Sequence, residues 1–202
     1  MTEAAAPAVD RWSGGTCPFG AGWRKVMMWW FIVTDGLLFA GFLASYGYSR
    51  ILAFDWPDQS QVFSLRDIAA MTFVLISSSA TMASAVLAAR EGHRQAALRF
   101  VLLTAAGGAV FLGMQAGEWT HLIREGARLS ANPWGEAAFG AYFFLLTGFH
   151  GTHVLTGAII LLVTAIRLAG GRATPEGVEM AGLYWHFVDL VWVFIFTLFY
   201  LL

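Results

Sequence analysis

The chain has 202 residues, of which 58% are hydrophobic and 12% are charged, and it contains nine Trp and seventeen Phe. An ordinary soluble domain carries about a quarter charged residues, so this composition excludes a soluble fold and indicates an integral membrane protein. The formal net charge of −1 gives no basic surface for nucleic acid. The single cysteine, Cys17, excludes an internal disulfide.

The N-terminal segment, residues 1–22, is rich in Ala, Pro and Gly and has no apolar core. It is therefore predicted to be a disordered cytoplasmic tail rather than a signal peptide. Cys17 lies in this tail, and we expect it to be an ordinary free thiol.

Five apolar segments follow in the chain, and each reaches the roughly 20 residues that a membrane span requires. The loops between them are short and carry Gly, Pro, Asn and Asp, which favour turns. The sequence predicts an all-α polytopic membrane protein in which residues 23–202 form one bundle of five transmembrane helices. The expected spans are Val26–Tyr48, Ile68–Ala89, Ala97–Leu122, Ala137–Arg167 and Met180–Leu202.

The distribution of Lys and Arg predicts the orientation. Eight basic residues lie on the side of the N-terminus, three of them in residues 11–25, three in 90–99 and two in 167–172. The other side receives four, in residues 50–66 and 124–128. Because basic residues accumulate on the cytoplasmic side, the N-terminus is expected in the cytoplasm and the C-terminus in the periplasm. The expected location is the cytoplasmic (inner) membrane of a bacterium.

Polar residues inside these spans are the candidate functional positions, because an ionisable side chain in hydrocarbon costs several kcal/mol unless it is paired or faces protein. Asp35 lies in the first span and Glu118 lies late in the third, near Gln115. Two further pairs have i, i+3 spacing, which places each pair on one helix face: His150 with His153, and His186 with Asp189.

These residues leave two interpretations open. His186 and Asp189 can act as structural polar anchors by pairing with His150 or His153 across the fourth and fifth spans. Alternatively, Asp35 or Glu118 can be linked to proton transfer, since a carboxyl group shielded from water can hold a proton. Both interpretations can hold at once.

A metal site is the third possibility, because Glu118-x-x-His121 resembles the Glu-x-x-His element of di-iron bundles. Helix rise places Asp35, His186 and Asp189 roughly 10–15 Å from the cytoplasmic end, and His153 at about 20 Å. Glu118 lies about 30 Å from the same end. Metal ligands must lie at one depth, so no metal or other cofactor is predicted in this chain.

Three motifs resemble a known family. They are Thr-Gly-Phe-His-Gly-Thr-His-Val at residues 147–154, Tyr-Trp-His-Phe-Val-Asp-Leu-Val-Trp at 184–192 and Gln-Ala-Gly-Glu-Trp at 115–119. With them, the chain from Val26 to Leu202 resembles subunit III of the heme-copper cytochrome c oxidases. Two departures stand out. That family usually has a buried Glu where this chain has the shorter Asp35, and its seven-helix members carry two further N-terminal helices across a lipid-filled cleft.

The resemblance implies an accessory, non-catalytic subunit of a terminal oxidase of aerobic respiration, which stabilises the catalytic subunit I and supports its proton uptake. Heme and copper are then expected in the partner subunits I and II, and bound phospholipid in this chain. The positions that carry over are Asp35 and Glu118 as proton-linked residues, and, as structural polar anchors, His150, His153, His186 and Asp189.

Two alternatives remain at this stage. Short five-helix relatives also accompany nitric oxide reductases, so the complex could reduce nitric oxide instead of oxygen. A membrane metalloenzyme that acts alone is the other alternative, and it predicts stoichiometric metal in this chain.

Overall fold

The computed structural model describes residues 22–202, so Cys17 and the predicted tail up to residue 21 lie outside the described part. Within residues 22–202 every regular element is helical. The bounds are α1 Trp23–Leu52, α2 Gln59–Val62, α3 Leu65–Arg90, α4 Arg94–Arg124, α5 Ala137–Ala169 and α6 Pro175–Ile195, and the π-helical segment η1 Phe196–Leu201 continues α6.

Five of these helices are long and apolar enough to cross a membrane: α1, α3, α4, α5, and α6 together with η1. This finding confirms the predicted all-α bundle with five spans. The helices extend beyond the apolar segments, since α1 begins at Trp23 and α5 runs on to Ala169. Hydrogen bonding inside a helix does not stop where the hydrocarbon stops, so hydropathy alone marks the spans too short.

The short helix α2 lies in the first loop, where the sequence predicted only a turn. Its N-cap is Asp58, whose carboxylate accepts hydrogen bonds from the backbone N–H of Ser60 at 3.0 Å and from the Ser60 hydroxyl at 2.8 Å. Such a cap satisfies backbone donors that a helix start leaves unpaired. These two hydrogen bonds lower the pKa of the Asp58 carboxyl.

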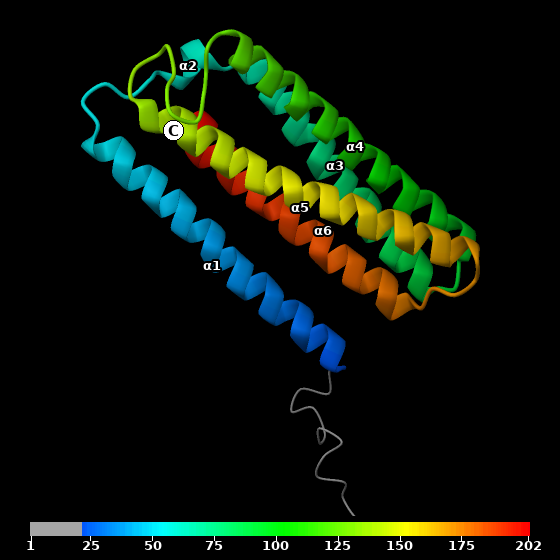
Figure 1. Ribbon diagram of the computed structural model, residues 1–202. Coiled ribbons are helices and arrows are strands. Elements are labelled where there is room, and N and C mark those ends of the chain that lie inside the picture. The colour runs from blue at the N-terminus through cyan, green and yellow to red at the C-terminus, as the bar shows by residue number, and fades with distance from the viewer. Residues whose placement is uncertain (1–21) are drawn as a thin grey trace, which may run out of the picture.

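The helices α3, α4, α5 and α6 form a four-helix bundle in which each packs on two neighbours in turn, and α1 lies beside α5 and α6 (Figure 1). The four bundle helices bury most of the core, whereas the buried residues of α1 are only Phe39 and Tyr46. The fold therefore consists of a tightly packed four-helix part and one more exposed helix.

Two tryptophans of α6 fill the centre of the bundle. Trp185 and Trp192 are 1% and 0% exposed. Each indole N–H donates a hydrogen bond of 3.0 Å to α3, from Trp185 to the Ser78 hydroxyl and from Trp192 to the Thr72 hydroxyl. A Cβ added at Gly108 would overlap the Trp185 ring, so this glycine of α4 makes room for the indole. Close approach of this kind drives helix association in lipid.

Candidate functional site: polar residues inside the bundle

Asp35 of α1 and His153 of α5 meet between their two helices. The imidazole Nε2 of His153 lies 3.3 Å from Oδ2 of Asp35, and the two side chains are only 14% and 12% exposed. Oδ2 accepts no aligned hydrogen bond from the residues that the structure describes, so the contact is a close pair of ionisable groups. The structure thus brings together two residues that the sequence assigned to different roles.

The second ring nitrogen of His153 determines where the proton lies. Nδ1 is 2.9 Å from the backbone carbonyl oxygen of Phe149, and a carbonyl oxygen can only accept, so Nδ1 carries a hydrogen. In neutral imidazole Nε2 then carries a lone pair beside the Asp35 carboxylate, and the contact brings no electrostatic gain. The contact is attractive when the pair holds one additional proton, either on the imidazole or on the carboxyl group.

This geometry differs from the expected pairing. Among the hydrogen bonds and ion pairs of residues 22–202, none joins His186 or Asp189 to His150 or His153. The sequence-based depths placed Asp35 nearer the cytoplasmic end than His153. On the observed helices Asp35 lies about 18 Å from the start of α1 and His153 about 24 Å from the end of α5, so a depth difference of about 6 Å remains, and the two side chains close it.

His186 and Asp189 instead face α3. The His186 Nδ1 shares a 2.6 Å hydrogen bond with the Ser79 hydroxyl. The Asp189 carboxyl lies close enough to interact with both Ser79 and His186, and the residue is 7% exposed. Sequence reasoning missed Ser79 because it lies in a run of small residues that indicates only close helix packing.

His150 is completely buried, and neither of its ring nitrogens has a hydrogen-bond partner in the described part of the chain. Its ring packs against Phe111 of α4 and Trp192 of α6, at centroid distances of 5.6 and 5.1 Å. His150 therefore contributes to the bundle here as an aromatic ring that touches both neighbouring helices.

Glu118 lies apart from the other polar residues, toward the opposite end of the spans. Its Oε2 accepts a 3.3 Å hydrogen bond from the hydroxyl of Tyr200 in η1. Glu118, Asp67 and His121 line a cavity of about 340 Å³ between α3 and α4. His121 turns its Nδ1 toward Glu125, at 3.5 Å, rather than toward Glu118.

The residues 22–202 contain no group of three or more His, Cys, Asp or Glu side chains arranged to hold a metal ion. Glu118 and Asp35 belong to separate clusters, as their different depths predicted. What the arrangement offers chemically is one close imidazole–carboxyl pair, Asp35–His153, and one hydrogen-bonded carboxyl group, Glu118.

The comparisons with known proteins agree on one family. The family described as cytochrome c oxidase subunit III matches residues 16–202. The chain is 34% identical to cytochrome bo(3) ubiquinol oxidase subunit 3 of Pseudomonas aeruginosa, over 94% of this chain and 87% of that protein. It is 35% identical to the probable cytochrome c oxidase subunit 3 of Nocardia farcinica, over 81% and 80%.

A third relative is quinol oxidase subunit 3 of Bacillus subtilis, with 35% identity over 86% of this chain and 84% of that protein. In this family the metal sites of the oxidase lie in other subunits. The match extends over nearly the whole chain and includes all five spans. The chain therefore belongs to the cytochrome c oxidase subunit III family, and its homologues are subunits of heme-copper oxidases.

Proposed function

We propose that this chain is an accessory, non-catalytic subunit of a heme-copper terminal oxidase, and that it stabilises the catalytic subunit I and supports proton uptake into it. The observation that carries the proton-linked part is the Asp35–His153 pair, an imidazole and a carboxyl group in close contact inside the spans. The family relation supports the oxidase part, since relatives named as subunit 3 belong to oxidases of cytochrome c and of quinol.

The pair joins α5 to α1, a 30-residue helix whose buried residues are Phe39 and Tyr46, and this placement supports a proton-handling role. The side chain of His153 is 14% exposed and that of Asp35 is 12% exposed, so the pair is largely buried but keeps some accessible surface. The hydroxyl of Tyr184 in α6 donates to the backbone oxygen of His153 at 3.2 Å and fixes this part of α5. A fixed imidazole beside a carboxyl group can take up and release a proton without a large structural change.

Further parts of the proposal concern the surroundings of the chain. The partner subunits I and II hold the heme and copper, phospholipid binds between the helices and the partners, and the membrane is the cytoplasmic membrane of a bacterium. The N-terminus is cytoplasmic, in line with the Lys and Arg distribution. Glu118 is the second proton-linked candidate, because its carboxyl group is hydrogen-bonded to Tyr200 beside a cavity.

The experiment is an affinity purification of the tagged chain in a mild detergent, analysed by mass spectrometry, by an optical heme spectrum and by gas consumption. We expect a heme-bearing catalytic subunit that consumes oxygen to co-purify. Consumption of nitric oxide instead would move the chain to a nitric oxide reductase complex. A chain that purifies without a heme subunit would contradict the proposal, and its own stoichiometric metal would favour the metalloenzyme alternative.

A further inference from the structure

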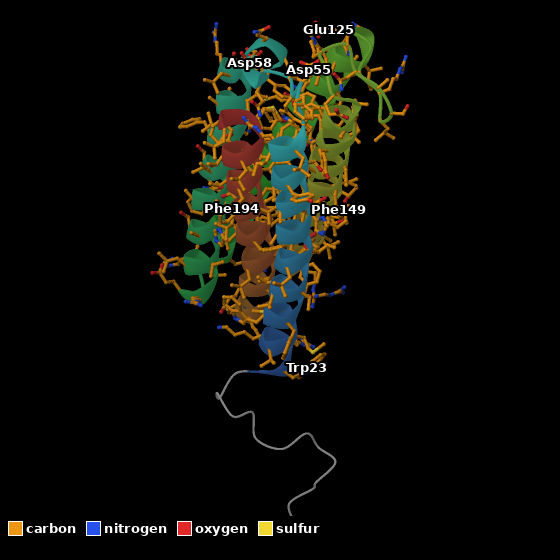
Figure 2. The ribbon with its side chains drawn as sticks, turned by 90° about the vertical axis from the view of Figure 1, so that its left-hand side faces the viewer. Trp23, Asp55, Asp58, Glu125, Phe149 and Phe194 are labelled. Carbon is orange, nitrogen blue, oxygen red and sulfur yellow. The ribbon has the colours of Figure 1, made fainter. Side chains whose placement is uncertain are left out.

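The cavity beside Glu118 lies at the end of the bundle where α3 begins and α4 ends. Figure 2 shows this end at the top, where Asp58 in front of α2 and Glu125 just after α4 are labelled, while Trp23 marks the opposite end. In the orientation proposed above, the top of the figure is the periplasmic end, because the N-terminus lies on the other side.

The cavity is lined by polar groups toward this end and by apolar groups toward the middle of the bundle. Asp67 lies about 3 Å from the start of α3, and His121 lies about 4.5 Å from the end of α4. Met71 and Met114, which also line the cavity, lie about 9 and 15 Å from the same two helix ends. Glu118 lies between His121 and Met114 on α4. The polar lining is therefore the outer part of the cavity, and the apolar lining closes it toward the bundle.

The depth of Glu118 brings it within reach of water. Helix α4 has 31 residues and a length of about 46 Å, whereas the hydrocarbon core of a bilayer is about 30 Å thick. A centred helix then extends about 8 Å beyond the hydrocarbon at each end, and Glu118 lies about 9 Å from the end of α4. The cavity of about 340 Å³ has room for several water molecules, since one occupies about 30 Å³ in the liquid.

The Glu118 carboxyl group is bound on one side only. Its Oε2 accepts the 3.3 Å hydrogen bond from the Tyr200 hydroxyl, and Oε1 accepts none from the described residues. Asp67 lines the same cavity, and no Lys or Arg of residues 22–202 does so. Two carboxylates that face one cavity repel each other, so a proton on one of them lowers the energy. A water molecule at Oε1 can deliver or accept that proton.

Few other titratable groups surround this carboxyl group. Those that face Glu118 from the elements packed around it are Asp67 of α3, His121 of α4 and Tyr200 of η1. The side chain of His121 is 68% exposed, so it meets water directly. Arg50 and Asp58 line a separate cavity, which shares the wall residue Phe63.

We propose that Glu118 exchanges its proton with the periplasmic aqueous phase through this cavity, whose mouth is formed by Asp67 and His121. The carboxyl group releases its proton to a water molecule in the cavity, and the remaining carboxylate keeps the hydrogen bond from Tyr200. The inference rests on the proposed function, from which it takes the proton-linked role of Glu118 and the orientation. It assigns Glu118 to the periplasmic side and leaves proton uptake from the cytoplasm to the Asp35–His153 pair.

Cysteine modification in membrane vesicles that contain the complex tests whether water reaches the cavity. Gly117→Cys places a thiol in the cavity, where an added Cβ meets nothing within 4 Å. The control is Leu145→Cys, at an exposed position of α5 about 12 Å from the helix start, which matches the depth of Gly117 at about 10 Å. Both variants also carry Cys17→Ser, which removes the native thiol.

A charged, membrane-impermeant methanethiosulfonate is the probe. Added from the periplasmic side, it should modify position 117 about tenfold faster than position 145, because it reacts with the thiolate, which forms in contact with water. Equal rates at the two positions would overturn the proposal. Modification of position 117 from the cytoplasmic side alone would also overturn it.

Infrared difference spectroscopy of the reconstituted complex follows the proton itself. The pH is changed on the periplasmic side only, and the C=O stretching band of protonated carboxyl groups is recorded. We expect a band change in the wild-type chain that persists in Asp35→Asn and is lost in Glu118→Gln. A spectrum that Glu118→Gln leaves unchanged would overturn the proposal. A complex without a heme subunit would contradict the proposed function instead, so the two failures are distinguishable.

Discussion

The four-helix part and α1 are held in place by different interactions, although both lie in the same membrane. In α3–α6, glycines and other small residues bring backbones together around Trp185 and Trp192. Helix α1 has few buried residues and is held by polar contacts at three depths: the ion pair of Lys25 with Glu179, the Asp35–His153 pair, and hydrogen bonds to Tyr142.

The comparison shows how a membrane protein can combine a rigid part with a more loosely attached helix. Apolar burial does not drive helices together in lipid, so packing shape and hydrogen bonds decide the association. Interhelical hydrogen bonds in lipid are typically worth about 0.6 kcal/mol and at most about 2 kcal/mol. A helix held by a few of them is easier to displace than one fitted around two tryptophans.

The largest effect is expected in the four-helix part, from Gly108→Ala. The added methyl group would overlap the Trp185 ring, which is fully enclosed, so we expect a loss of about 2 kcal/mol in stability. Gly113→Ala is the control, because it lies on the same helix and a Cβ there meets nothing within 4 Å. Thermal unfolding in detergent should separate the two variants. Equal stability would mean that α6 does not depend on the close approach at Gly108.

A smaller effect is expected where α1 joins α5. The Tyr142 hydroxyl lies 2.8 Å from the hydroxyls of both Ser45 and Ser49. Tyr142→Phe should weaken this contact by about 1 kcal/mol and leave the four-helix part unchanged. Disulfide trapping between cysteines placed in α1 and α5 measures how closely the two helices approach each other.

Tyr48→Phe is the matched control for Tyr142→Phe, since Tyr48 lies on the same side of the membrane and is 68% exposed. Unchanged trapping efficiency in Tyr142→Phe would show that α1 is held by packing, and the contrast between the two parts would disappear.

The smallest effect is expected in the loop after α1. The Ser60 hydrogen bonds lower the pKa of Asp58, so the charged carboxylate stabilises this N-cap above the ordinary pKa and the contribution is lost as the pH falls through the lowered value. Ser60→Ala should therefore raise the pKa of Asp58 toward its usual value of 3.8. Gln61→Ala, which removes the weakest of these contacts, should change it less, as NMR titration of the carboxyl carbon can measure. An unmoved pKa in Ser60→Ala would show that the Ser60 hydroxyl does not stabilise the Asp58 carboxylate.

The sequence predicted the five spans because an apolar run of about 20 residues rarely forms anything but a membrane-spanning helix. It also located the polar positions, since charged residues stand out in apolar segments. It did not predict their partners. The pairing of Asp35 with His153 depends on the length of each helix and on the position of α1 against α5 and α6. The hydropathy pattern contains neither the lengths nor this position.

Other contacts were missed for a related reason. Ser79 and Tyr142 are ordinary residues for a membrane helix, and only the packing of α3 on α6 and of α1 on α5 gives them partners. Tyr200 is a similar case. An aromatic residue near the end of a span usually lies at the membrane interface, yet Tyr200 is buried and its hydroxyl donates to Glu118. A rule that searches for hydroxyl groups at the depth of each intramembrane His or carboxyl would have selected Ser79.

The most direct test of the account is the lifetime of the oxidase during turnover, measured as the number of oxygen molecules reduced before inactivation. Three complexes are compared: with the wild-type chain, with Asp35→Asn and without the chain. We predict that removal of the chain shortens the lifetime, and that Asp35→Asn assembles normally but alters the rate of proton-coupled turnover. A lifetime that does not change when the chain is removed would contradict the account, and an unchanged rate and lifetime in Asp35→Asn would reduce the Asp35–His153 pair to a structural contact.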